Sequence, residues 1–360
     1  MPAAPIVVYG ASGYTGRLVV AEARRRGLDL VLSGRDGTKL RALARAGETA
    51  RAAALDDRDA LRHAFAGAAA VINCAGPFTR YGEPVLRAAI DTGVHYVDTT
   101  GEQGWIRRVF ERHDDAARAA EVAAIPAVGF DYVPGDLICR LVADGLEPLD
   151  ELVLAYGVQG FGATRGTMHS ALEAVRAEGP RRPRRQSFTF PEPLGRQVMA
   201  DYPCGEVVTV PRHTRVRTLT PLITATAFAP SPALAGAVPF VLPGLALALR
   251  TPAKALLDLA IDRLPEGPSE EDRRGARWTI AAVARGADGA TRRGVVRGAD
   301  VYGLTAVTAV HSAALLAAPG FDRSGALSPA SAFDPAAFLE ALGDHGVSHE
   351  LDRAPAGAAS

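Results

Sequence analysis

The sequence lacks the features that mark secreted proteins, proteins with structural metal sites and membrane-spanning proteins. Only three of its 360 residues are cysteines, and Cys74, Cys139 and Cys204 are widely spaced with no C-x-x-C pair. This spacing argues against a disulfide framework and against a structural zinc site, so we expect no metal and a reducing, cytoplasmic setting. A chain of this length is expected to fold as about two domains without disulfides or structural metal ions.

The chain also has no excess of charge of either sign, because 40 Lys and Arg residues balance 40 Asp and Glu residues. A neutral chain has no general attraction to nucleic acid or to anionic membranes, so no nucleic-acid partner is expected. The longest apolar run, residues 233–249, contains Pro239 and Pro243 and is shorter than the ~20 residues of a membrane span. Because the N-terminus has no basic segment, we expect neither a signal peptide nor a transmembrane helix.

The first 130 residues contain short apolar segments that alternate with longer amphipathic ones. This alternation is typical of a parallel sheet covered by helices on both faces, and it predicts an α/β, doubly wound Rossmann domain in residues 1–130. The expected strands are 6–9, 30–33, 49–53, 70–73, 95–98 and 123–128, and the expected helices are 15–26, 37–45, 57–66, 84–92 and 106–120.

The pattern changes after residue 130, which places a second, mixed α/β domain in residues 131–300 and a C-terminal segment in 301–360. The segment 179–186, which holds four arginines around two prolines, is interpreted as a solvated loop, and a phosphate or partner site is the alternative. The expected elements of this part are helices 135–143, 167–177 and 302–317, a strand 151–156, and a hairpin of strands 277–285 and 291–297.

The strongest motif is G-x-x-G-x-x-G in residues 10–16, between the first strand and the first helix. A dinucleotide diphosphate needs the N–H groups of a helix N-terminus and turn residues without a Cβ. Gly10 and Gly13 supply the turn and the close approach, and Gly16 lets the helix pack on the sheet. The predicted phosphate-binding loop consists of Gly10, Ala11, Ser12, Gly13, Tyr14, Thr15 and Gly16.

The end of the second strand, Ser33-Gly34-Arg35, favours NADP(H) over NAD(H). An acidic residue at this tip would bind the ribose 2′-hydroxyl of NAD, whereas an arginine can pair with a 2′-phosphate. Lys39 is a candidate second positive charge. The alternative is that Arg35 is a solvated loop residue and that Asp36 binds the ribose. Asp56, after the third strand, is expected to cap the next helix or to bind the adenine amine.

The fourth strand ends at the carboxyl edge of the sheet, where open sheets bind their ligands. Small residues there let the backbone pass the nicotinamide ribose, and Phe78 is expected to form a wall beside the ring. Cys74 lacks an electropositive setting, which favours a buried thiol over a nucleophile. The segment adds the cofactor candidates Cys74, Ala75, Gly76, Pro77 and Phe78.

Several motifs together share the pattern of a known family. They are residues 10–16, 73–78, 81–85, 95–102 and 129–136, Gly166-Thr167 with Ser170, and residues 327–333. With them the chain resembles the saccharopine dehydrogenase-like reductases, which include trans-acting enoyl reductases, over nearly its whole length. The resemblance implies a saccharopine-dehydrogenase-like second domain whose sheet often pairs two subunits in a homodimer, and a C-terminal helix that returns to the Rossmann domain.

The substrate is not fixed by this resemblance. Amino-acid-forming relatives follow the second-domain strand with a cysteine and two glycines, whereas this chain has Tyr156–Gly160, and no arginine cluster is evident to clamp two carboxylates. The apolar residues 233–261 favour a long acyl or polyketide-like substrate or a peripheral membrane contact. The simpler interpretation of this segment is a core or dimer-face helix pair.

Reduction of a conjugated C=C bond needs a hydride donor at the β-carbon and a hydrogen-bond donor at the carbonyl oxygen. The resemblance implies polar substrate-site residues at Tyr96 and Asp131. We expect Tyr96, Tyr132 and His169 to converge on a cleft between the domains, with Asp131 orienting a donor or handling a proton. Each tyrosine is also compatible with a structural role.

The sequence thus predicts an NADPH-dependent oxidoreductase that reduces an enone or enoyl bond of a hydrophobic substrate. Two alternatives stay open. One is an imine reductase or a saccharopine-type, C–N forming dehydrogenase, and the other is a non-catalytic NADP(H) sensor. Asp98 and Glu102 are expected to cap the following helix and to fix its turn.

Overall fold

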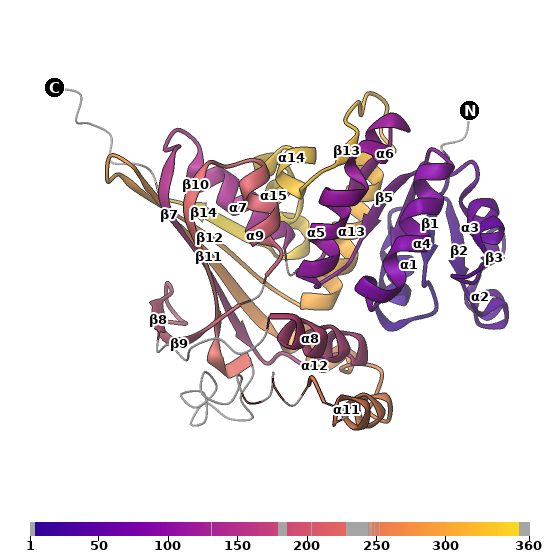
Figure 1. Cartoon of the computed structure of the whole chain (residues 1–360), viewed down its shortest axis with the longest axis horizontal. Helices are drawn as coiled ribbons and strands as arrows, with labels where there is room; N and C mark the ends of the chain where they lie inside the picture. Colours follow the sequence, from indigo (N-terminus) through magenta and orange to yellow (C-terminus); the bar gives the residue numbers. More distant parts are fainter. Residues whose placement is uncertain are drawn as a thin grey trace.

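The computed structural model describes residues 4–130, 132–178, 186–202, 204–227, 244, 247, 249–251 and 253–352. These residues form two sheets with helices packed around them, one toward each end of the molecule (Figure 1). The predicted α/β class, with a parallel Rossmann sheet and a mixed second sheet, is confirmed. Asp131, the arginine-rich segment 181–185 and most of the apolar run 233–249 lie outside the described residues.

The first sheet is parallel, in the order β13-β6-β5-β4-β1-β2-β3. The chain leaves β1 in one direction and β4 in the other, and a ligand binds at such a switch point beyond the carboxyl ends of the strands. The strands are β1 (Ile6–Tyr9), β2 (Leu30–Gly34), β3 (Thr49–Ala52), β4 (Ala70–Asn73), β5 (His95–Asp98), β6 (Ala123–Ile125) and β13 (Gly325–Ala326).

Helices cover both faces of this sheet, as buried parallel strands require. Two helix predictions were wrong. The helix expected at 106–120 breaks at His113, whose φ of −122° and ψ of −5° are not helical, and the helix expected at 84–92 begins already at Phe78. The helices are α1 (Tyr14–Arg25), α2 (Gly37–Leu43), α3 (Arg58–Phe65), α4 (Phe78–Asp91), α5 (Gln103–Arg112) and α6 (Asp114–Ala119).

The second sheet is mixed, in the order β14-β12-β11-β7-β10-β9-β8, and among its described strands β7 and β10 form the one parallel pair. The predicted hairpin is confirmed as β11 and β12. The strands are β7 (Leu149–Gln159), β8 (Gln186–Thr189), β9 (Arg196–Asp201), β10 (Val216–Thr224), β11 (Arg277–Gly286), β12 (Thr291–Ala299) and β14 (Ser348–Leu351).

Helix α7 (Val133–Ala143) packs on β11 and β12, and α8 (Arg165–Glu178) packs against α11 (Ala253–Asp262). None of the helices in the described ranges is long and apolar enough to cross a bilayer. The remaining helical elements of the second half are α9 (Glu206–Thr209), η1 (Val210–Arg212), η2 (Ala225–Ala227), α12 (Glu270–Gly275), α14 (Pro329–Ala332), α15 (Pro335–Ala341) and η4 (Gly343–His345).

Helix α13 (Val301–Leu316) joins the two halves of the molecule, because it runs back along α1 and beneath β4 and β5. Most of its residues are buried. Two threonines fasten it to the first domain: the backbone N–H of Phe130 donates to Thr305 Oγ1 at 3.1 Å, and Thr308 Oγ1 donates to the carbonyl of Val128 at 2.6 Å. The carboxyl edge of the first sheet therefore lies against the second domain.

Candidate cofactor and substrate site

The glycine loop has the geometry that a diphosphate needs. Gly10 has a φ of +79°, a left-handed conformation that side chains disfavour. A Cβ on Gly16 would lie 2.1 Å from the carbonyl oxygen of Gly10, so only glycine lets α1 approach the loop. Gly13 is the N-cap of α1 and, among the described residues, no side chain caps this helix end. The N-terminal N–H groups and the helix dipole thus fit an anionic ligand.

Arg35 and Asp36 are adjacent but differ in what their side chains do. Asp36 Oδ1 accepts hydrogen bonds from the N–H groups of Thr38 and Lys39, both at 3.1 Å, and so caps α2. Lys39 Nζ lies 3.9 Å from the other Asp36 oxygen. Arg35 is exposed, and in the described part of the chain no hydrogen bond or ion pair holds its guanidinium. This arrangement favours a 2′-phosphate at Arg35 over a ribose hydroxyl at Asp36.

The expectation that Asp56 caps the next helix was wrong. Asp57 is the N-cap of α3 and accepts from the N–H of Ala60 at 2.9 Å, while Asp56 stays exposed. Burial raises the pKa of Tyr9 to about 12, and the charges of Arg35 and Asp56 act on the same hydroxyl with opposite sign. Arg35 and Asp56 therefore border one region at the ends of β1 and β2.

The loop after β4 approaches the glycine loop closely. A Cβ on Gly10 would lie 3.1 Å from the backbone nitrogen of Ala75, so the two loops run side by side. Burial raises the pKa of Cys74 to about 12, which agrees with a packing thiol and not with a nucleophile. Phe78 is only 5% exposed and belongs to the core beneath α4 and α5. The expectation that its ring forms an open wall of the nicotinamide site was therefore wrong.

Glu102 was predicted to cap the helix that follows it, α5, but its side chain caps α4 instead. Its carboxylate accepts from the N–H groups of Phe78 at 2.7 Å and Thr79 at 2.8 Å, at the start of α4, and makes no cap on α5. Ser170 Oγ of α8 donates to the same carboxylate at 3.0 Å. The start of α4, the loop after β5 and the second domain are thus joined through one buried carboxylate.

Tyr96 lies inside the first domain and does not reach a cleft, which corrects the expectation of a catalytic role. It is fully buried, and its hydroxyl donates to Asp98 Oδ2 at 2.8 Å and accepts from Asn73 Nδ2 at 3.1 Å. Asp98 also accepts from Trp105 Nε1 and from two backbone N–H groups. Burial raises the pKa of Asp98 to about 6 against these bonds. This network holds the end of β5.

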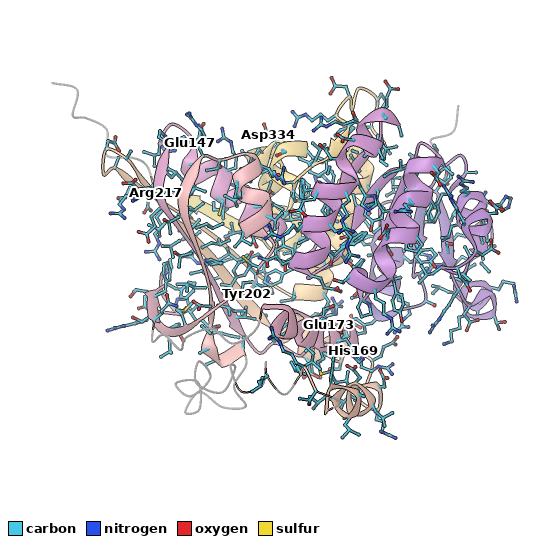
Figure 2. The ribbon with its side chains drawn as sticks, viewed as in Figure 1. Glu147, His169, Glu173, Tyr202, Arg217 and Asp334 are labelled. Carbon is cyan, nitrogen blue, oxygen red and sulfur yellow. The ribbon has the colours of Figure 1, made fainter. Side chains whose placement is uncertain are left out.

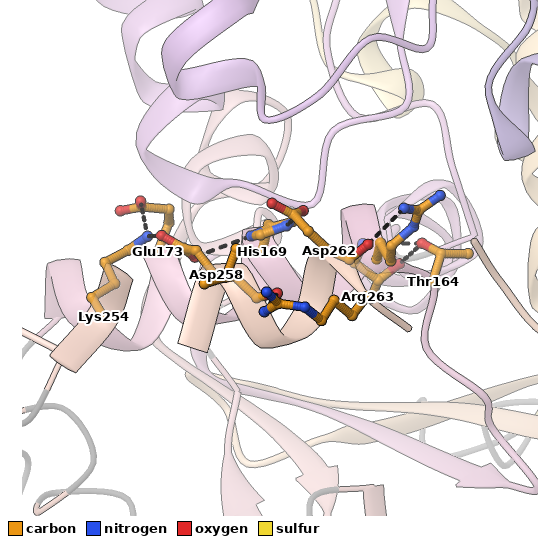
Figure 3. Close-up of polar contacts among 10 residues, drawn as sticks. Thr164, His169, Glu173, Lys254, Asp258, Asp262 and Arg263 are labelled. Carbon is orange, nitrogen blue, oxygen red and sulfur yellow. Dashed lines mark hydrogen bonds and ion pairs between the residues drawn. The ribbon is translucent and has the colours of Figure 1, made fainter. Parts of the chain in front are cut away.

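The structure does not bring the predicted donors together. Tyr132 is 1% exposed and its hydroxyl donates to the carbonyl of Gly101 at 2.7 Å, at the edge of the sheet. His169 points away from this edge toward α11, with its ring nitrogens 3.1 Å from Asp258 and 3.0 Å from Asp262 (Figure 3). The convergence of Tyr96, Tyr132 and His169 on one cleft is therefore not observed.

Contacts of the glycine loop with the second domain were missed from the sequence. Tyr14, predicted as a cofactor residue, donates its hydroxyl to the carbonyl of Pro268 at 3.0 Å and packs edge-on against Tyr302 at 5.4 Å. Arg17 donates to the carbonyl of Ser12 at 2.6 Å and to Glu266 at 2.7 Å. The basic residue directly after Gly16 was a usable signal, whereas nothing in the sequence marks Glu266 as its partner.

Comparisons with known proteins agree with this geometry. Residues 6–125 match the family described as saccharopine dehydrogenase NADP binding domain. A Caenorhabditis elegans protein named lipid droplet localized protein is 35% identical over 146 residues, which are 37% of this chain and 34% of that protein. The trans-acting enoyl reductase of Mycobacterium leprae is 38% identical over 143 residues, or 37% of this chain and 34% of that protein. The chain thus spans about a third of the length of these curated relatives.

The similarity in fold extends much further than the similarity in sequence. Apo saccharopine dehydrogenase (L-Glu forming) from Saccharomyces cerevisiae superposes with a TM-score of 0.62 at 12% identity, over 97% of this chain and all of that one. Residues 6–125 are accordingly an NADP(H)-binding domain of the saccharopine dehydrogenase type, carried by a chain that has the saccharopine dehydrogenase fold.

Proposed function

We propose that the protein is an NADPH-dependent oxidoreductase that reduces the C=C bond of an enone or enoyl group in a hydrophobic substrate. The observation that carries the proposal is the glycine cradle with Arg35 beside it, whose guanidinium has no partner among the described residues, at a sheet edge that the second domain covers. Bound NADPH supplies a hydride from its nicotinamide ring. Gly10–Gly16 hold the diphosphate, Arg35 holds the 2′-phosphate, and the contacts of Tyr14 and Arg17 hold the covering segment in place.

A hydrophobic substrate is supported by the unusual orientation of α11. Its polar residues turn toward α8, where Lys254 pairs with Glu173 at 3.0 Å and with Asp258 at 2.7 Å (Figure 3). Its leucines turn outward, and Leu256 is 72% exposed and Leu259 49% exposed. Leucines on a protruding surface helix fit a lipid or acyl chain. The name of the Mycobacterium leprae relative favours enoyl reduction, and that of the Caenorhabditis elegans relative favours a lipid setting.

The reaction is tested by incubating the protein with NADPH and three sets of probes: 2-enoyl thioesters of increasing chain length, cyclic imines, and an amine with a keto acid. We expect loss of NADPH absorbance with the enoyl thioesters, faster for the longer chains. Turnover of imines or of the amine pair alone would establish the C–N chemistry instead. Binding of NADPH without turnover of any probe would identify a sensor.

A matched pair of glycine variants shows whether turnover depends on the cradle. Gly16→Ala places a Cβ 2.1 Å from the Gly10 carbonyl oxygen, whereas nothing lies within 4 Å of a Cβ on Gly104 in α5. We expect Gly16→Ala to abolish NADPH binding and turnover and Gly104→Ala to retain both. Equal behaviour of the two variants would contradict the assignment of the cradle.

Contact with a lipid surface through residues 233–261 is the second part of this proposal. Flotation with phosphatidylcholine vesicles is expected to recover the protein, and Leu256→Ser combined with Leu259→Ser to reduce the recovered fraction severalfold. Leu351→Ser, at a 39% exposed leucine of β14, is the control. Equal recovery of the double variant and the wild type would show that α11 does not contact the vesicle surface.

A further inference from the structure

Glu206 is a buried carboxyl group that the proposed function has not yet used. It begins α9, it is fully inaccessible to solvent, and no cation pairs with it in the described part of the chain. The hydroxyl of Tyr156 donates to Glu206 Oε1, and the Cys204 thiol is a further neighbour. Glu206 Oε2 has no hydrogen-bond partner among the described residues. Such a group is costly to bury in its charged form.

Glu206 and Tyr156, called the pair below, lie between the carboxyl edge of the first sheet and the second domain. Two residues before Glu206, the carbonyl of Cys204 accepts from Gln103 Nε2 at 3.1 Å, next to Glu102. A Cβ on Gly205 would lie 2.5 Å from Ile106 and 3.2 Å from the ring of Tyr132. The pair is therefore fixed to the start of α5, next to Glu102, whose carboxylate binds the start of α4 after the β4 loop.

The absence of a side chain at Gly135 leaves the space that the Tyr156 hydroxyl and the Glu206 carboxyl group occupy. A Cβ on Gly135, in the first turn of α7, would lie 2.2 Å from the Tyr156 hydroxyl and 2.3 Å from Glu206 Oε1. Gly135 belongs to the motif 129–136 that the sequence analysis singled out. The motif therefore has a physical role here, which is to bring the backbone of α7 against the two side chains.

Two neighbouring carboxyl groups have pKa values that are shifted in opposite directions. Burial raises the pKa of Glu206 to about 8, and the nearby charge of Asp136 adds to that rise. Burial also acts to raise the pKa of Asp136, but His213 Nε2 at 3.0 Å, Thr209 Oγ1 and the N–H of Ala330 hold it below its usual value. Pairs of titratable groups with separated pKa values are typical of acid–base sites. The titratable groups that act on Glu206 or on its neighbours Tyr156 and Asp136 are Asp136, Cys139, Tyr156, Tyr202, Cys204 and His213.

We propose that Glu206, acting through Tyr156, stores and delivers the proton that completes the reduction. The inference rests on the proposed function. Reduction of C=C adds a hydride, with its two electrons, to one carbon and a proton to the other, while NADPH becomes NADP⁺. The substrate takes its proton from the Tyr156 hydroxyl, and the hydrogen bond between Tyr156 and Glu206 Oε1 reverses as the carboxyl group of Glu206 gives its own proton to the tyrosine oxygen. Glu206 is then the positioning residue, and solvent returns the proton to it.

Tyr202 supplies the link between this buried pair and the surroundings. Its side chain, labelled in Figure 2, is half-buried, and its ring lies 5.2 Å from the ring of Tyr156. Tyr156 itself is 1% exposed. The Tyr156 hydroxyl is therefore shielded from bulk water, and we assign the return of the proton from solvent to the half-buried Tyr202 beside it.

The stored proton is tested first without any substrate, by infrared difference spectroscopy of the intact protein against Glu206→Gln at neutral pH. We expect the wild type to show the C=O band of a protonated carboxyl group that Glu206→Gln lacks, and to lose it at strongly alkaline pH. A spectrum in which the two proteins show the same carboxyl band would overturn the inference, whatever the substrate is.

Delivery of the proton is tested by the pH profile of kcat with the enoyl thioester. The wild type is expected to lose activity above about pH 8, and Glu206→Gln and Tyr156→Phe to lower kcat about 100-fold without an alkaline limb. The KM for NADPH is expected to stay unchanged. Asp136→Asn removes a neighbouring negative charge, so it is expected to move the limb to lower pH without removing it.

The control is Ser312→Ala, which changes another buried polar group, on α13, and is expected to keep the wild-type profile. A Glu206→Gln protein that binds NADPH and keeps the wild-type kcat and alkaline limb would refute proton delivery by Glu206. Failure of every probe to react, with the infrared band present, would refute the proposed function and with it the delivery step, while leaving the stored proton established.

Discussion

Arg35 and Asp36 show how two adjacent charged residues take different roles. The carboxylate of Asp36 is used by the N-terminus of α2, and the guanidinium of Arg35 is left to solvent. An exposed arginine at the tip of β2 is available for a phosphate, and charge-assisted bonds of this kind contribute about 1.5–3 kcal/mol each. We therefore expect selectivity for NADP(H) to depend on this side chain.

Arg35→Ala is expected to weaken NADPH binding about 10- to 100-fold, because it removes the partner of the 2′-phosphate. NADH binding is expected to change little. Arg58→Ala is the control, since Arg58 is an exposed arginine of the same domain that pairs with Asp91 at 2.8 Å. The measurement is fluorescence titration of each variant with both coenzymes, and an equal loss for NADPH and NADH would show that Arg35 does not select the phosphate.

Helix α4 shows how an element can depend on a residue far away in the sequence. Its first N–H groups have no cap from preceding residues, and Pro77 stands at its N-cap. Glu102 fills this place from the next strand–helix connection, and such a cap stabilises a helix by roughly 1 kcal/mol. Because Ser170 donates to the same carboxylate, the cap also holds α8 against the first domain.

Glu102→Gln is expected to lower the free energy of unfolding by about 1–3 kcal/mol, since the amide offers one acceptor where the carboxylate used both oxygens. The measurement is urea unfolding, with Glu111→Gln at an exposed position of α5 as the control. If Glu102→Gln unfolds at the same urea concentration as the wild type, the cap contributes nothing to stability.

The same elements show how far the sequence could predict the structure. Local patterns sufficed for six of the seven strands of the first sheet, for the glycine loop and for the hairpin of β11 and β12, but not for the two-residue strand β13. The start of α4 was predicted six residues late because Pro84 marks a local boundary, whereas the real one is set by the distant Glu102. The pairing of Tyr156 with Glu206 leaves no periodicity or spacing in the sequence, so only the fold reveals it.

On the scale of the whole molecule, the two domains are tied together around the proposed cofactor site. Tyr14 and Arg17 join the glycine loop to residues 266–268, Glu102 joins β5 to α8, and α13 packs under the first sheet. A ligand bound at this junction contacts segments of both domains. Saturating NADPH, at about 100 times Kd, is therefore expected to stabilise the whole chain by about 2.7 kcal/mol.

Glu206 is expected to make stability fall as pH rises from about 5 to about 8, because its folded-state pKa is raised to about 8 from an ordinary value of 4.5 and the folded chain then holds its proton where the unfolded chain has lost it. Burial lowers the pKa of His95, His113, His311 and His345, which acts with the opposite sign below about pH 6.5, so the fall is expected to be clearest between about pH 6.5 and 8. Glu206→Gln is expected to remove a slope of roughly 1 kcal/mol per pH unit, measured by urea unfolding at several pH values. An unchanged slope would show that Glu206 ionises normally in the fold.

Calorimetric titration of the wild-type protein with NADPH and with NADH tests the central assignment most directly. The glycine cradle and the exposed Arg35 predict saturable binding of NADPH that is at least tenfold tighter than binding of NADH. Equal affinities, or no heat of binding for NADPH, would contradict the assignment of this sheet edge as an NADP(H) site.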